Sequence, residues 1–311
     1  MLDEPSVLAL HADSGDVLAV GHEAWQMIGR TPGSIRAVRP LRHGAITDFD
    51  VTQRMIRLLL ARVGVSRMNR PRVVICVPSA ITEVERRAVT EAARRAGAAD
   101  AQLLEQPVAA AIGAGLPIDR ALGNMVVDVG GGTSETAVIS LGGVVALRAI
   151  RTGSFDVDHA IQSWMKRGHG VSVGERTAEE IKVVIGTASA STDEVKAEVR
   201  GRDLRTGLPK TVVISSHEVR RAIEEPVRAI CDAVVACLSR CPPDLAQDLI
   251  RLGIHLVGGG GKLRGLDQRL ADESGVPVHL VDAPHECVVL GAGRCLESYE
   301  SLKGLFMGAR T

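Results

Sequence analysis

The stretch Asp128-Val-Gly-Gly-Gly-Thr133 decides the fold, because a run of apolar residues ends there in a carboxylate and three glycines. Residues 125–129 are typical of a buried strand, and residues 134–140 of the strand that follows it. Glycine allows positive φ and close approach of a ligand. Consecutive amides in such a turn can hold phosphate oxygens, and Asp128 can hold a hydrated Mg²⁺ beside them. A plain hairpin is the alternative, since Gly-Gly is a common hairpin turn.

A second glycine run, Gly258 to Gly261, follows a predicted strand at 254–257 and precedes a predicted helix at 264–273. In open α/β sheets, ligands bind outside the carboxyl ends of the strands, so we expect both glycine runs at that edge. The spacing matches neither a P-loop nor a dinucleotide fingerprint, and a flexible strand-to-helix turn is the alternative. Gln106, between a predicted strand and a helix, is a third candidate, because an amide can orient a water for attack on a terminal phosphate.

The rest of the chain alternates strands and helices, which indicates an α/β protein. Residues 72–77 form an apolar run between two prolines and predict a strand covered on both faces. Thr82 and Glu85 form a capping box that predicts a helix ending at Gly97. Strands are expected at 194–200 and 210–214, and one long helix at 216–239.

Composition excludes several classes of function. The 311 residues contain 37 Lys and Arg and 37 Asp and Glu, and this balance argues against nucleic acid held by a basic field. Aromatic residues make up 2%, too few for base-stacking surfaces. No apolar run approaches the roughly 20 residues that span a bilayer, and we expect no signal peptide. Six scattered cysteines fit reduced thiols, and the length suggests about two domains in a cytoplasmic protein.

Longer segments resemble the MreB family of bacterial actin homologues, the rod shape-determining proteins. The segments that carry the resemblance are residues 4–7, 30–33, 71–78, 107–115, 128–135, 138–143, 174–182 and 258–267. The resemblance implies an actin-like, duplicated ribonuclease H-like α/β fold with two lobes around a nucleotide cleft. The first lobe would be 1–118, with a small subdomain at about 4–43, a core at about 44–118, and completion by about 290–311. The second lobe would be 119–289, with a core at about 119–152 and 220–289 and a small subdomain at about 153–219.

The resemblance also implies ATP and Mg²⁺ as cofactors. Its implied phosphate contacts are Gly130, Gly131, Gly132, Gly258, Gly259, Gly260 and Gly261, and its implied nucleoside contacts are Glu179, Glu180, Ile181 and Lys182. Asp128 would lie near the metal and act in catalysis together with Gln106. The implied function is that of a cytoskeletal subunit, in filaments at the inner face of the cytoplasmic membrane that direct cell shape and wall synthesis. Its partners would be other family subunits and morphogenetic or wall-elongation membrane proteins, without nucleic acid.

Two departures from the family weaken the expected ATPase. The sequence begins after the family's first strand-turn-strand, which carries D-L-G-T, so we expect half of the phosphate clamp and the first strands of lobe one to be missing. Gln106 replaces the usual glutamate and is a weaker proton acceptor. A hydrolysis-deficient scaffold that accompanies a full-length relative is therefore the alternative function. A kinase-like or chaperone-like enzyme would need a further substrate domain.

Membrane contact is expected to be weak on the sequence alone. No amphipathic helix precedes Glu4, and the loop 65–70 offers only Val65 and Met68 as bulky apolar residues.

Overall fold

The computed structural model describes residues 1–65, 70–190 and 194–308. The chain forms two compact units: Met1–Leu104 with the residues from Phe306 on, and Glu105–Leu305. The lobes implied by the resemblance, with their boundary at residue 118, stay a prediction. Most of the loop 65–70 that was considered for membrane contact lies outside the described residues.

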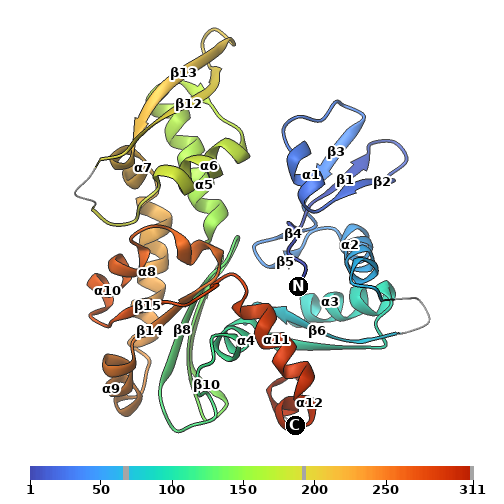
Figure 1. Ribbon diagram of the computed structural model, residues 1–311, viewed down its shortest axis with the longest axis vertical. Coiled ribbons are helices and arrows are strands. Elements are labelled where there is room, and N and C mark those ends of the chain that lie inside the picture. Colours follow the sequence, from blue (N-terminus) through green and yellow to red (C-terminus); the bar gives the residue numbers. More distant parts are fainter. Residues whose placement is uncertain (66–69, 191–193, 309–311) are drawn as a thin grey trace. The chain divides into compact units, whose positions relative to one another are not determined.

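The first unit contains small sheets and three helices among its described residues (Figure 1). In one sheet, β1 (Leu8–His11) pairs antiparallel with β2 (Val17–Val20) and β3 (Ile35–Val38). The other strand pairs are β4 (Leu41–Arg42) with β5 (Ala45–Ile46), and β6 (Arg72–Val77) with β7 (Asp100–Glu105). The helices are α1 (His22–Met27), α2 (Phe49–Arg62) and α3 (Glu83–Ala96).

Two predictions about this unit have different outcomes. The capping box is confirmed, because the Thr82 hydroxyl accepts from the Glu85 amide and the Glu85 side chain accepts from the Thr82 amide. The strand at 72–77 is present, but the prediction that it is covered on both faces is wrong. Only Val77 of this strand is buried, since among the described residues β6 pairs with β7 alone.

The second unit is built on a five-stranded sheet of order β10-β9-β8-β14-β15 (Figure 1). The strands are β8 (Asn124–Val129), β9 (Ser134–Ser140), β10 (Gly143–Ile150), β14 (Ile254–Val257) and β15 (Val278–Leu280). The first three form an antiparallel meander, whereas β14 runs parallel to both β8 and β15. Every residue of β8 is buried, which confirms the buried strand predicted before the first glycine turn.

The remaining elements of this unit surround that sheet or extend from it. The helices are α4 (Gln106–Gly113), α5 (Ser154–Trp164), α6 (Glu175–Ile185), α7 (Ser216–Ala222), α8 (Glu224–Leu238), α9 (Pro243–Leu252), α10 (Leu266–Ser274), α11 (Cys287–Glu297) and α12 (Tyr299–Leu302). A π-helical turn covers Met165–His169, and 3₁₀ turns cover Gly259–Lys262 and Lys303–Leu305. A second, three-stranded sheet consists of β11 (Val171–Ser172), β12 (Lys196–Asp203) and β13 (Pro209–Ser215).

The single helix predicted at 216–239 is wrong, because the structure has two helices that meet at Ile223. Pro226 explains the break. It lacks the amide hydrogen that would bond back to Ala222, and its ring crowds the preceding turn. Helix α9 was not predicted, although Pro243 near its start and Gly253 at its end are the usual signals.

Helices α4 and α11 pack with their backbones in contact. A Cβ added to Gly291 would lie 1.8 Å from the Ala109 carbonyl oxygen, and one added to Gly113 would lie 1.8 Å from the Cys287 carbonyl oxygen. Neither contact can be relieved by moving a side chain, since both obstacles are main-chain atoms. The two glycines therefore set the distance between these helices.

We expect Gly291→Ala to lower the free energy of unfolding by roughly 1–3 kcal/mol, because that is what over-packing a fixed contact costs. Gly293→Ala is the matched control in the same helix, since its added Cβ meets no atom within 4 Å. The control should be neutral or up to about 1 kcal/mol more stable, from helix propensity. Urea unfolding measures both variants. Equal stability of the two would contradict the backbone contact.

Candidate functional site

The first glycine turn joins β8 to β9 and is fixed to helix α5. The Gly130 amide donates to the Thr133 carbonyl at 2.9 Å and closes the hairpin. The carbonyls of Gly130 and Gly131 accept from the amides of Ser154 (3.0 Å) and Phe155 (2.8 Å). The tip of the turn is thus held at the start of α5.

Positive φ does not explain the glycines of this turn, because neither Gly130 nor Gly131 adopts it. A Cβ on Gly131 would lie 2.9 Å from the ring of the exposed Phe155 side chain, so that ring would have to move. Gly153, which was not among the predicted site residues, is required by a contact with the main chain. Its Cβ would lie 2.7 Å from the Gly131 carbonyl oxygen.

The second glycine turn follows β14 and lies directly against the first. Val257 pairs with Asp128 across the parallel strands, so both chains leave the sheet at the same edge, as predicted. Gly258 has φ of 82°, and its Cβ would be 2.4 Å from both Asp128 Oδ1 and the Val129 carbonyl oxygen. Only glycine fits there, both for its φ and for its size.

Three amides at this junction donate to no acceptor among the described residues: those of Gly131, Gly259 and Gly260. The amides of Gly130, Gly258 and Gly261 are used within the protein, with Thr133, Pro284 and Gly258 as acceptors. A set of free amides at a glycine turn suits phosphate oxygens.

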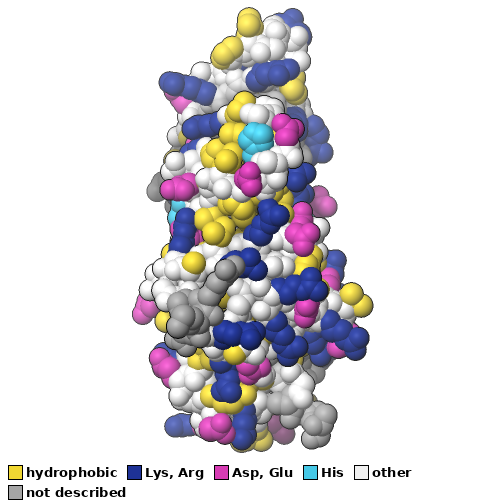
Figure 2. Space-filling view, turned by 90° about the vertical axis from the view of Figure 1, so that its right-hand side faces the viewer, with side chains coloured by type: hydrophobic (Ala, Val, Ile, Leu, Met, Phe, Trp, Pro, Cys, Tyr) yellow, Lys and Arg dark blue, Asp and Glu magenta, His cyan; other side chains and the backbone are white. Residues whose placement is uncertain are grey.

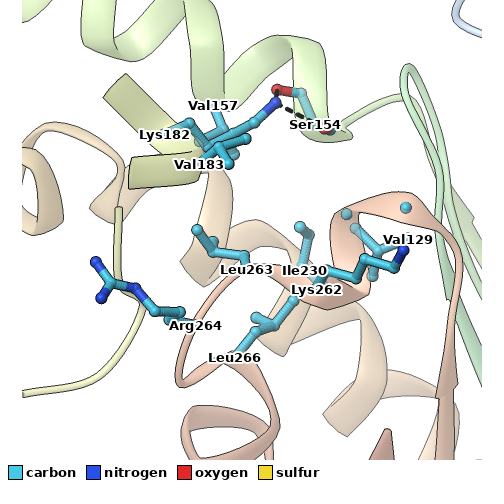
Figure 3. A pocket seen from close by; sticks show the side chains of 12 residues that line it. Val129, Ser154, Val157, Lys182, Val183, Ile230, Lys262, Leu263, Arg264 and Leu266 are labelled. Carbon is cyan, nitrogen blue, oxygen red and sulfur yellow. Dashed lines mark hydrogen bonds between the residues drawn. The ribbon is translucent and has the colours of Figure 1, made fainter. Parts of the chain in front are cut away.

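A cavity of about 200 Å³ opens beside the two turns (Figure 3). Its lining consists of Val129, Ser154, Val157, Lys182, Val183, Ile230, Gly259, Gly260, Lys262, Leu263, Arg264 and Leu266. Of the predicted site residues, it includes Lys182, Gly259 and Gly260. The other lining residues were missed. They come from the end of β8, from α5, α6 and α8, and from residues 262–266, and only tertiary packing brings these segments together.

The partners of the Lys182 ammonium are residues of helix α5, although Lys182 also lines the cavity. It lies 2.9 and 3.0 Å from the two carboxylate oxygens of Asp158. It also lies 3.1 Å from the Ser154 hydroxyl (Figure 3). Both charged side chains are largely buried. Burial raises the pKa of Asp158 to about 6, although the charge of Lys182 opposes this shift. The pair therefore joins α5 to α6 across the wall of the cavity.

The residues of α6 that were predicted to contact the nucleoside do not all line the same hollow. Lys182 lines the cavity, whereas Glu180 and Ile181 line a different hollow, against β12. Glu179 lies near enough to Asp158 to raise its pKa but does not line the cavity. A helix turns successive side chains to different sides, and the nucleoside contacts of Glu180 and Ile181 stay a prediction.

Asp128 lies at the end of β8, on the side of the sheet opposite Val127 and Val129. Burial raises the pKa of Asp128 to about 6. Its charge also helps raise the pKa of Cys287 in α11, after burial of that thiol, so the two side chains are neighbours. Gln106 is the half-buried first residue of α4, which packs on β8.

The described residues contain no cluster of three or more His, Cys, Asp or Glu side chains that could hold a metal ion alone. A single carboxylate does fit Mg²⁺, which keeps several waters and is usually bound through one or two carboxylates and the substrate's phosphates.

Comparisons with known proteins agree on one family. A family model described as MreB/Mbl protein matches residues 1–304. The cell shape-determining protein MreB of Escherichia coli strain K12 is 47% identical over 303 residues, which cover 96% of this chain and 87% of that protein. The cell shape-determining protein Mbl of Bacillus subtilis strain 168 is 44% identical over 303 residues, with 97% and 91% covered.

Solved structures confirm the predicted actin-like fold. MreB5 of Spiroplasma citri bound to ADP matches with a TM-score of 0.90 and 32% identity, covering 96% of this chain and 90% of that one. The same protein bound to AMPPNP matches with a TM-score of 0.91. The MamK double helical filament has a TM-score of 0.79 at 18% identity, which supports the fold alone.

We expect Lys182→Met to lower the free energy of unfolding by roughly 3–5 kcal/mol, because it leaves the Asp158 carboxylate buried without its partner. Lys182→Met combined with Asp158→Leu should recover most of this loss. Lys196→Met is the control, since Lys196 is exposed and its ion pair with Glu194 is long, at 3.9 Å. This substitution should change the free energy of unfolding by less than about 0.5 kcal/mol. A destabilised double variant would contradict a structural role of the pair.

Asp128 should make stability depend on pH. The pKa of the Asp128 carboxyl is about 6 in the folded protein and 3.8 in the unfolded chain. Below about pH 4 the carboxyl is protonated in both states, so its burial does not lower the stability. Above about pH 6 it is ionised in both states, and the folded state bears the full cost of burying the charge. A shift of about 2 pH units corresponds to roughly 3 kcal/mol. Relative to the natural chain, Asp128→Asn should therefore gain up to that amount between pH 4 and pH 7.5 in urea unfolding. A difference that does not change with pH would contradict the buried carboxylate.

Proposed function

The chain belongs to the MreB/Mbl family of cell shape-determining, actin-like proteins, and we propose that it binds an adenine nucleotide where its two glycine turns meet. The observation that carries the proposal is the direct contact of the turns, which places the free amides of Gly259 and Gly260 in the lining of the cavity and that of Gly131 in the adjoining turn. The ADP and AMPPNP bound by the similar MreB5 support it.

In this proposal the residues around the site have three roles: binding the phosphates, contacting the nucleoside and positioning the helices. The amides of Gly131, Gly259 and Gly260 donate to the phosphate oxygens. The apolar side chains of Val157 and Leu263 face the nucleoside. Lys182 positions α6 against α5, since its charge is already paired with Asp158.

Mg²⁺ would supply positive charge against the phosphates, and Asp128 is the residue that would hold it. Asp128 suits this role because burial makes its ionised form costly, and a cation offsets that cost. Gln106, at the start of the neighbouring helix α4, would orient the attacking water, and its amide makes hydrolysis slow.

We further propose that the chain assembles with copies of itself and with family relatives, as a filament-forming subunit.

We also propose that the chain contacts anionic membrane surfaces. The described residues between 54 and 95 include nine arginines and three glutamates. Figure 2 shows a face on which Lys and Arg side chains gather. Such side chains are attracted to the anionic cytoplasmic leaflet. No helix among the described residues is long and apolar enough to cross a membrane. Membrane proteins of wall synthesis would be the partners at this surface.

Gly259→Val tests the nucleotide site without disturbing the fold. An added Cβ at Gly259 meets no atom within 4 Å, and the residue lines the cavity, so the larger side chain would occupy the ligand's space. We expect ADP affinity, measured by calorimetry, to fall at least about tenfold, equivalent to 1.4 kcal/mol. The melting temperature should stay unchanged.

The control is Gly174→Val, which also meets no atom within 4 Å but lies outside the cavity. It should bind ADP like the natural chain. In the natural chain Mg²⁺ should strengthen binding, and Asp128→Asn should remove that effect. If Gly259→Val binds ADP normally, the phosphates do not lie at this turn.

A further inference from the structure

The second sheet of the second unit has an incompletely paired strand. β12 pairs with β13 along nearly its whole length, from Lys196 opposite Ser215 to Arg202 opposite Pro209. On its other edge it pairs with β11 only at Arg202 and Asp203. Among the described residues, no strand covers that edge from Lys196 to Arg200. An edge of this kind is a template for pairing with another chain.

The backbone groups that face this open edge follow from the regular register. The main-chain amides and carbonyls of odd-numbered residues point to β13, because the Asp203 amide donates to the Leu208 carbonyl and the Val195 carbonyl accepts from the Ser216 amide. Even-numbered residues face the other way, as the bond from the Leu204 amide to the Gly170 carbonyl shows. Alternation along an unbroken antiparallel ladder therefore directs the amides and carbonyls of residues 196, 198 and 200 to the open edge.

A hollow of about 420 Å³ runs beside the same edge, between α6 and β12 (Figure 1 shows the two elements). Ile181 and Val184 of α6, with Ala197 and Val199 of β12, give it an apolar lining. Its charged residues are Glu180, Glu198 and Arg200, and all three are exposed. None of them forms an ion pair within the described part of the chain.

The chain itself shows which strand fits. β11 runs antiparallel to β12 and covers its end, but the chain leaves this line at Gly174, where α6 begins. A strand that continued the line of β11 would pass Arg200 first, then Val199, Glu198 and Ala197. The residue opposite Arg200 would best be acidic and the one opposite Glu198 basic, since opposite charges on facing residues are favourable. The residues between them would be apolar and would enter the hollow.

We propose that this edge binds an extended segment of a partner protein, in the order acidic, apolar, basic, apolar, as an added strand antiparallel to β12. Main-chain hydrogen bonds would hold the segment, and the hollow and its charges would select it. The amides of the acidic and basic residues point to β12, whereas the amide of the apolar residue between them points away. Blocking one or the other of these amides therefore distinguishes strand addition from non-specific binding.

The test uses the full chain and the fluorescent peptide acetyl-Thr-Glu-Val-Lys-Val-Thr-amide, titrated by fluorescence anisotropy. We expect saturable binding, at least fivefold weaker for the charge-reversed peptide Thr-Lys-Val-Glu-Val-Thr. N-methylation of the peptide's lysine should abolish binding, while N-methylation of the preceding valine should preserve it. Glu198→Lys should weaken binding about fivefold, and the peptide Thr-Glu-Val-Glu-Val-Thr should restore it.

Glu225→Lys, at an exposed glutamate of α8, is the matched control and should bind like the natural chain. Peptide binding that ignores charge order, N-methylation and Glu198→Lys would overturn the proposal. So would the absence of any binding at millimolar peptide. Self-association that Glu198→Lys abolishes, without peptide binding, would also overturn it, because the occupant would then be a second copy of the chain.

Discussion

The parallel pairing of β8 with β14 is the constraint on which the site depends. It places Val257 beside Asp128, so that two segments more than a hundred residues apart leave the sheet at the same edge. The chain beyond each strand must then pass the other at contact distance. Gly258 makes this passage possible, since a side chain there would overlap Asp128 and the Val129 carbonyl. The free amides of Gly259 and Gly260, which line the cavity, follow directly after this passage.

Much of this architecture could be predicted because its signals are local. The buried strand before Asp128, the hairpin after it and the capping box of α3 each depend on a few neighbouring residues. The meeting of the glycine turns also followed, since strand ends in α/β sheets share an edge. The break of the long helix at Pro226 had a local signal that the apolar periodicity of the flanking residues outweighed.

The rest depends on contacts between distant segments. The sequence shows that Lys182 is a cation but not that Asp158, on another helix, neutralises it. It places Glu180 and Ile181 beside Lys182 in the chain, whereas the helix turns them towards β12. Likewise, glycines at 131 and 153 look like turn residues, yet neither has positive φ. Gly153 is required by its contact with the main chain of the first glycine turn, and Gly131 lies against the Phe155 ring. Identifying such roles requires the packed structure.

The most direct test of the central claim is a nuclear magnetic resonance titration of the isotope-labelled chain with ADP and Mg²⁺, followed at the glycine amides. The amides of Gly131, Gly259 and Gly260 should shift together with one dissociation constant, because all three would donate to the same ligand. The amide of Gly293, remote from both turns along the chain and inside α11, should not shift with them. Saturable nucleotide binding that leaves those three amides unmoved would contradict the account.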